Sequence, residues 1–329
     1  MKKQILRALK NNKENFISGE ELSHQIGVTR TAVWKHIKGL KEDGYEIESI
    51  SRKGYRLLKE PDILDADILE IEIKNRYIGN KVIHFDQVES TNTVAKRMAS
   101  EGAEEGTVVI AEEQIGGRGR LGRNWISPKK KGIWMSIILR PLIDPMEAAK
   151  ITQIAAAAVA NGLMNITHKF VGIKWPNDII INNKKVCGIL TEMSAELNCM
   201  NYIIVGIGMN VNMTNKEFPE EIESIATSIR ECIGKEVSRK EIIKEVLHSF
   251  EELYLDFIQN KNIQKSLDLC KDYSVTLGKE VKIKSQHEEI IAYAMDISED
   301  GQLIIKKSTG EIKKVLSGEV SVRGITDYV

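Results

Sequence analysis

The sequence has 329 residues, enough for two or three domains with separate cores, and it carries 47 basic and 47 acidic side chains. No stretch reaches the roughly 18 apolar residues of a membrane span, which predicts a soluble, cytoplasmic protein without a membrane partner. The cysteines are widely spaced and form no C-x-x-C pair, which predicts reduced thiols and no zinc site. They are Cys187, Cys199, Cys232 and Cys270.

The zero net charge hides an asymmetry, because residues 1 to 60 contain 13 Lys and Arg but only 8 Asp and Glu. Apolar residues recur there at helical spacing in three short segments. They are Ile5, Leu6 and Leu9; Leu22 and Ile26; and Val33, Ile37 and Leu40. Gly27 and Thr29 are helix stop and start signals, so the last two segments predict a helix-turn-helix.

Residues 45 to 58 alternate as two strands around a turn at 51 to 54, which predicts a wing with a basic tip. Three helices and a hairpin also fit a protein-docking module, but the positive charge favours DNA. Residues 1 to 62 are therefore predicted to form a winged helix-turn-helix domain, followed by a linker. The candidate DNA contacts are Arg30, Thr31, Lys35, Arg52 and Lys53.

Residues 63 to 272 mix short apolar strands with helices, and the short connections predict a mixed or antiparallel sheet flanked by helices. One helix is predicted to begin at residues 90 to 92, where hydroxyl and amide side chains can cap it. Residues 145 to 163 predict a buried helix, and a third begins at Ser238 with a capping box. Residues 273 to 329 predict five short strands of a small barrel, so the whole chain is of the α+β class.

Residues 117 to 122, GRGRLG, formally match the G-x-G-x-x-G dinucleotide motif. A strand precedes them, but Pro128 and the apolar residues 132 to 139 follow where that motif requires a helix. The context therefore excludes a nicotinamide site. Residues 114 to 143 hold seven basic side chains and no acidic one, which suits either a polyanion-binding loop or a solvated basic loop.

Five motifs then carry a family resemblance. They are STN at 90 to 92, QIGGRGRLGRNW at 114 to 125, KWPND at 174 to 178, NNKKVCGIL at 182 to 190 and GIGMNVN at 206 to 212. In this order, behind a winged helix-turn-helix, they resemble the bifunctional biotin protein ligases that also repress the biotin operon. The resemblance implies a biotin/lipoyl ligase-like central domain and a C-terminal SH3-like β-barrel.

The resemblance implies that the biotin carboxylate attacks the α-phosphate of ATP to give biotinyl-5′-adenylate and pyrophosphate. A lysine of a biotin carboxyl carrier protein domain then displaces AMP. Mg²⁺ is implied as the counter-ion of ATP, with no assigned metal ligands. Biotinyl-adenylate is expected to favour a homodimer that binds operator DNA. Two alternatives remain: a regulator that senses a small carboxylate and has lost catalysis, and a lipoyl or other acyl-protein ligase with an appended interaction module.

Lys185 and Arg118 are the implied catalytic residues, as positive charges for the biotin carboxylate and the α-phosphate. Without the resemblance, Lys185 is better explained as a solvated turn lysine, and Ser90 and Thr91 as helix-capping residues. Trp125 is expected to stack on adenine, with core cover as the alternative. The remaining implied contacts to biotin or its adenylate are Ser90, Thr91, Asn92, Gln114, Gly117, Gly119, Arg120, Gly188, Gly206 and Gly208. Those on the adenylate side are Trp125, Lys174, Asn177, Asp178 and Asn210.

Overall fold

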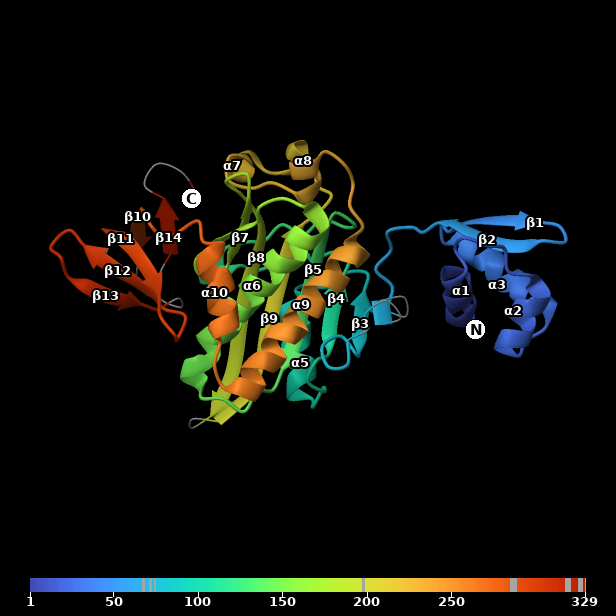
Figure 1. The fold of residues 1–329 in the computed structure, drawn as a ribbon, viewed down its shortest axis with the longest axis horizontal. Coiled ribbons are helices and arrows are strands. Elements are labelled where there is room, and N and C mark those ends of the chain that lie inside the picture. Colours follow the sequence, from blue (N-terminus) through green and yellow to red (C-terminus); the bar gives the residue numbers. More distant parts are fainter. Residues whose placement is uncertain are drawn as a thin grey trace. The chain divides into compact units, whose positions relative to one another are not determined.

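The computed structural model describes residues 1–66, 69–70, 73, 75–196, 199–284, 289–316, 321–324 and 328. The chain separates into two compact units, Met1–Ile71 and Glu72–Val329 (Figure 1). The boundaries expected at residues 62 and 272 stay a prediction. No helix among the described residues combines the length and the apolar character that a membrane crossing needs.

The first unit has the predicted three helices and a hairpin. They are α1 (Lys2–Asn11), α2 (Gly19–Ile26), α3 (Arg30–Glu42) and the antiparallel strands β1 (Glu46–Ile50) and β2 (Gly54–Lys59). One apolar cluster contains every residue of the predicted helical pattern, with Ile26 at its edge.

The turn between α2 and α3 follows from two residues. Gly27 ends α2 in the left-handed region at a φ of 72°, where glycine is favoured. The Thr29 side chain accepts a hydrogen bond from the backbone N–H of Ala32 and so begins α3. Both predicted signals are confirmed.

The second unit contains a seven-stranded sheet in the order β3-β4-β5-β9-β8-β7-β6. β3 and β4 are parallel and all other pairs are antiparallel, which confirms the predicted mixed sheet. The strands are β3 (Val82–Phe85), β4 (Val108–Ala111), β5 (Gly132–Leu139), β6 (Gly172–Lys174), β7 (Asp178–Ile181), β8 (Lys184–Glu196) and β9 (Cys199–Asn210). Because β5 follows β4 antiparallel, residues 114–125 connect two strands, as the rejection of a dinucleotide motif required.

Helices cover this sheet. α5 (Thr91–Ser100) packs on it through Ala95 and Ala99. α6 (Ala148–Thr167) is preceded by the 3-10 turn η2 (Pro145–Glu147). It is buried almost all round, because it packs on the sheet and also contacts the helices α9 (Arg239–Asn260) and α10 (Gln264–Asp272), which lie beside it (Figure 1). The Ser238 side chain accepts from the Glu241 N–H at the start of α9, as predicted.

The C-terminal strands form a five-stranded antiparallel sheet in the order β13-β12-β11-β10-β14. They are β10 (Glu280–Lys284), β11 (Glu289–Ile297), β12 (Leu303–Lys307), β13 (Ile312–Val315) and β14 (Ser321–Gly324). The predicted last strand also included residues 319 and 320, which lie outside the described residues. Ile173 of β6 exchanges backbone hydrogen bonds with Tyr273 and Val275, so the segment leading to this sheet begins along the edge of the larger one.

Candidate functional site

One pocket of the second unit receives residues from all five motifs. It opens among β7, β8, β9, the start of α5 and the loop between β4 and β5. Most predicted site residues line it. They are Ser90, Thr91, Asn92, Gln114, Arg118, Gly119, Arg120, Trp125, Asn177, Asp178, Lys185, Gly188, Gly206, Gly208 and Asn210.

Gly117 and Lys174 are the predicted residues that do not line this pocket. A Cβ at Gly117 would lie 2.3 Å from the carbonyl oxygen of Trp125, so this glycine lets the loop pack against itself. Lys174 is only 4% exposed, and its ammonium lies over the ring of Tyr328, which does line the pocket.

Lys185 of β8 pairs in the sheet with Ile180 of β7, and its side chain reaches Asp178 two residues away, with its Nζ 2.5 Å from the Asp178 Oδ1. It lies in β8, which contradicts the alternative of a turn lysine that the family resemblance had already set aside. Its backbone N–H donates to the carbonyl of Ile225 at 2.8 Å, and its carbonyl accepts from the N–H of Thr227 at 2.9 Å. These hydrogen bonds fix the backbone of Lys185, and the ion pair with Asp178 fixes its ammonium group.

The charges around Asp178 control ionisation in this region. Burial opposes ionisation of Asp178, but Lys185, Tyr328 and Lys174 outweigh it and hold the pKa of the carboxyl below its usual value. Burial lowers the pKa of Lys174 to about 7, although the Asp178 charge partly offsets this effect. Burial also lowers the pKa of Arg120, whose guanidinium donates to the Asn177 Oδ1 at 2.8 Å.

A chain of hydrogen bonds sets the STN motif. Ser90 holds the N-cap position of α5 but makes no side-chain cap, so the predicted capping role was wrong. The Gln114 Oε1 instead accepts from the Thr91 N–H at 2.8 Å. The Ser136 hydroxyl donates its one hydrogen to the Asn92 Oδ1 at 2.6 Å and lies 2.8 Å from the Thr91 hydroxyl. The Asn92 Nδ2 donates to the Glu192 Oε2 at 2.7 Å. The motif is thus held from β5, β8 and the β4–β5 loop.

The glycines of β8 and β9 make room for protein side chains. A Cβ at Gly206 would lie 2.2 Å from the Asn92 Oδ1, and one at Gly208 would lie 2.5 Å from the Trp125 Nε1. The Trp125 indole therefore covers Gly208, one of the implied contacts to biotin or its adenylate. Its buried Nε1 finds no hydrogen-bond acceptor in the described part of the chain.

An apolar wall completes the pocket, and no sequence motif predicted it. Met213, Phe218 and Ala226 form a small buried cluster with Ile222 packed against it, and all four line the pocket. Ala226 forms an isolated parallel β-bridge with Lys185, so the apolar wall begins beside the lysine. Its members are single apolar residues in or beside the short helices η3 (Asn215–Glu217) and α7 (Glu220–Glu223), which are too brief to show a helical period in the sequence.

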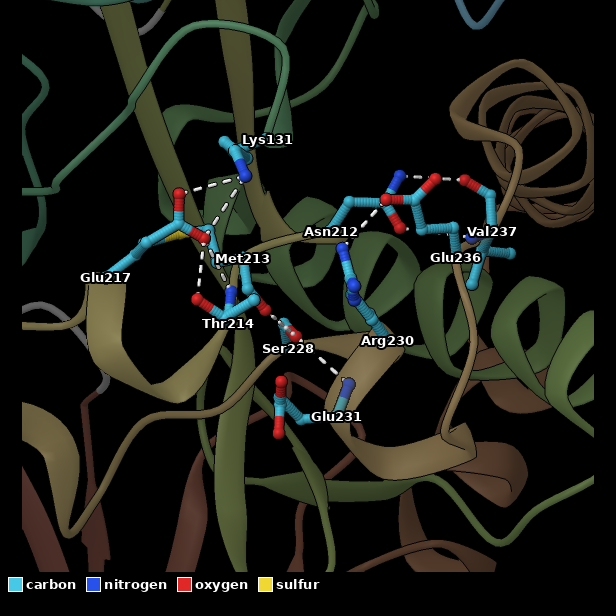
Figure 2. A network of polar contacts seen from close by, with 10 residues as sticks. All are labelled: Lys131, Asn212, Met213, Thr214, Glu217, Ser228, Arg230, Glu231, Glu236 and Val237. Atoms are coloured by element: carbon cyan, nitrogen blue, oxygen red, sulfur yellow. Dashed lines mark hydrogen bonds and ion pairs between the residues drawn. The ribbon is translucent and has the colours of Figure 1, made fainter.

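Figure 2 shows the polar contacts that fix this wall. The Ser228 hydroxyl donates to the carbonyl of Met213, and Asn212 exchanges two hydrogen bonds with the backbone of Val237. Glu217 accepts from Thr214 and pairs with Lys131 at 2.9 Å. The segment after β9 is thus anchored at both ends.

Two residues of the C-terminal strand β14 and Tyr328 also reach the pocket. Val322, Arg323 and Tyr328 line it, a contribution that sequence reasoning left undecided. No group of three or more His, Cys, Asp and Glu side chains with metal-binding geometry occurs among the described residues.

The first unit presents a separate concave surface between α3 and the hairpin. Arg30 and Arg52 line it, together with Trp34, Lys38 and Lys41. Thr31, Lys35 and Lys53 are exposed but lie outside that groove. Trp34 was not predicted and is 57% exposed on α3, although large apolar side chains are usually buried.

Comparison with family models identifies three regions of the chain. Residues 84–210 match the biotin/lipoate A/B protein ligase family, residues 2–56 match an HTH domain, and residues 276–323 match the biotin protein ligase C-terminal domain.

Similar proteins agree over nearly the whole length. The bifunctional ligase/repressor BirA of Bacillus subtilis is 37% identical over 98% of both chains, and that of Escherichia coli is 27% identical over 94% of this chain and 93% of its own. The structure of biotin protein ligase from Aquifex aeolicus in complex with biotin and ATP is 34% identical, covers 74% of this chain and 99% of its own, and has a TM-score of 0.64. The predicted resemblance is confirmed: the chain belongs to the biotin/lipoate protein ligase family and, within it, to the bifunctional ligase/repressors.

Proposed function

We propose that this chain activates biotin with ATP, transfers it to a lysine of a biotin carboxyl carrier protein domain, and represses transcription when biotinyl-adenylate is bound. The main support is the pocket in which all five motifs meet around the Lys185 ion pair. The solved Aquifex aeolicus relative, with biotin and ATP bound, supports the same pair of substrates.

The first reaction needs positive charge where negative charge gathers. As a carboxylate oxygen of biotin bonds to the α-phosphorus and pyrophosphate leaves, Lys185 and Arg118 stabilise the oxygens of both groups. Arg118 pairs with the exposed Glu89, at 3.2 Å between nitrogen and oxygen, a contact of low strength that a ligand can replace.

The second reaction transfers the acyl group to the acceptor amine. Its nitrogen attacks the carbonyl carbon of the mixed anhydride, the bond from that carbon to the phosphate oxygen breaks, and AMP leaves. The protein positions the partners and excludes water, which would otherwise hydrolyse the anhydride.

We assign the biotin end to the side of Asn92, Gln114 and Gly206, and the adenine end to the apolar wall around Met213 and Phe218. In this assignment Trp125 leaves Gly208 when biotin enters, and its unsatisfied Nε1 makes the present position costly to keep. The loop between β4 and β5 then closes over the adenylate as a lid. Gly122, in the left-handed region at a φ of 71°, gives it a turn that a larger side chain would strain.

Biotin-dependent exchange of labelled pyrophosphate into ATP tests the ligase. Exchange with biotin supports the proposal, and its absence would favour a sensor without catalysis. Exchange with lipoate but not biotin would instead identify a lipoyl ligase. Labelling of a carrier domain by the same preparation tests the second reaction.

The repressor function rests on the first unit. Two winged helices on a two-fold operator require a dimer, which we propose biotinyl-adenylate stabilises. Deleting residues 1 to 60 should abolish the gel shift of operator DNA, and a truncated chain that still shifts the operator would refute the assignment. Sedimentation with and without biotin and ATP tests the dimer. A cytoplasmic location belongs to this proposal and agrees with four unpaired thiols.

A further inference from the structure

Tyr328 contacts the acidic member of the pocket from the C-terminal end of the chain. Its hydroxyl donates to the Asp178 Oδ2, and the Lys185 Nζ lies 2.5 Å from the other oxygen, Oδ1. The two partners therefore use different oxygens of one carboxylate and do not compete. Together they fix the rotation of the carboxylate plane, which either contact alone would leave less restricted.

The ring of Tyr328 makes a second contact in the same motif. The Lys174 Nζ lies 3.3 Å from the ring centroid, a cation–π contact in a largely buried setting. Trp175, the next residue of the motif, is held by Thr276, before β10, and by Gly301, between β11 and β12. The Trp175 Nε1 donates to the carbonyl of Gly301 at 3.0 Å, and its backbone N–H donates to the Thr276 Oγ1 at 2.9 Å.

Residues of the C-terminal region thus contact Lys174, Trp175 and Asp178 of the KWPND motif, each through a separate interaction. The match to the biotin protein ligase C-terminal domain ends at residue 323, so Tyr328 lies beyond the residues that this family model covers. The contact between Tyr328 and Asp178 therefore lies outside what the family model covers.

We propose that Tyr328 is a positioning residue: it holds Asp178 in the orientation that aims the Lys185 ammonium at the biotin carboxylate and the α-phosphate. The inference rests on the proposed ligase function. Its structural basis is a chain of three groups, the phenol, the carboxylate and the ammonium, each in direct contact with the next. The alternative is a plug in which Tyr328 occupies substrate space.

Two variants separate the two contacts. Tyr328→Phe removes the hydroxyl but keeps the ring against Lys174, whereas Tyr328→Leu removes both. The turnover number for biotin-dependent pyrophosphate exchange should fall roughly tenfold in Tyr328→Phe, as expected for loss of one hydrogen bond to a charged group. The KM values for biotin and ATP should change less than about twofold, because no substrate contact is removed. Tyr293→Phe, at an exposed tyrosine of β11, is the matched control and should leave exchange unchanged.

The pH profile gives a readout that a purely structural residue would not change. Asp178 is faced by Lys185 from β8, Lys174 from β6, Arg120 from the β4–β5 loop and the hydroxyl of Tyr328. Loss of the hydroxyl removes one donor to the ionised carboxylate, so the pKa of Asp178 should rise and the acid limb of exchange should move to higher pH in Tyr328→Phe.

A double-mutant cycle tests whether Tyr328 acts through Asp178. In an Asp178→Asn background, Tyr328→Phe should cost less than about twofold, because the group it positions is gone. Full exchange in Tyr328→Phe, equal losses in both backgrounds, or a lower KM for ATP, as a plug would give, would each overturn the inference. A wild-type chain without any exchange would instead remove the ligase function on which the inference rests.

Discussion

The two units differ in how their functional surfaces are assembled. In the first, Arg30 and Arg52 lie on α3 and in the hairpin turn, within 23 positions of sequence and on elements that contact each other. In the second, the pocket joins residues as distant as Ser90 and Tyr328. A local surface depends on local folding signals, and an assembled pocket depends on long-range contacts, so substitutions should act differently in the two units.

The largest expected effect is on stability, at a buried ion pair of the second unit. Arg239 at the start of α9 and Glu112 after β4 pair at 2.6 Å with side chains only 0% and 4% exposed. Arg239→Met leaves the carboxylate buried without its main counter-charge, which should lower the free energy of unfolding by about 4 kcal/mol. Lys59→Met removes an exposed pair of the first unit, with side chains 74% and 61% exposed, and should cost less than about 1 kcal/mol. Denaturant titration of both variants measures the contrast, and equal losses would contradict it.

The next effect is on catalysis. Lys185→Ala should lower biotin-dependent pyrophosphate exchange about 100- to 1000-fold, as expected for loss of a positioned charge at a developing oxyanion. Lys184→Ala is the matched control, because the Lys184 Nζ donates to the backbone carbonyl of Glu223 instead of facing the pocket. Near-normal exchange in Lys185→Ala, with a native thermal transition, would remove this lysine from the active site.

The first unit should respond with a smaller change. Arg30→Ala and Arg52→Ala should each weaken operator binding about 3- to 10-fold, and a lost phosphate contact should reduce the salt slope by about 1. Pyrophosphate exchange should remain. Arg7→Ala, at an exposed arginine of α1 outside the groove, serves as the control. Gel shifts at several salt concentrations measure both quantities, and an Arg7 effect as large as the others would argue against the groove.

The smallest expected effect is the pH dependence from Lys174. Its pKa is lowered to about 7 in the folded protein, so between pH 7 and 10 the unfolded chain binds more protons than the folded one. Stability should therefore rise with pH in this window, by on the order of 1 kcal/mol between pH 7 and 8. Lys174→Met should lack that rise. Denaturant titrations at the two pH values test it, and parallel curves for both proteins would show that Lys174 does not titrate there.

Sequence reasoning predicted the elements better than the site. The three helices of the first unit follow from apolar spacing and from caps at Gly27 and Thr29, which are local signals. The seven strands were recognisable as short apolar runs, and the family motifs located the pocket. The capping role of Ser90 was wrong, because the Thr91 N–H donates to Gln114 instead. For Lys185, local spacing alone favoured a turn lysine, whereas the residue lies in β8.

What the sequence alone determined is therefore the plan: a winged helix-turn-helix, a mixed sheet with flanking helices, and a set of glycines, arginines and lysines suited to phosphate and carboxylate. The tertiary structure decided which of these groups meet. Asp178 contacts Lys185 through the register of β7 and β8, and it contacts Tyr328 over a separation of 150 positions. The physical reason is that local spacing encodes which face of an element is buried, whereas a pocket forms where distant elements pack, and no local period encodes that packing.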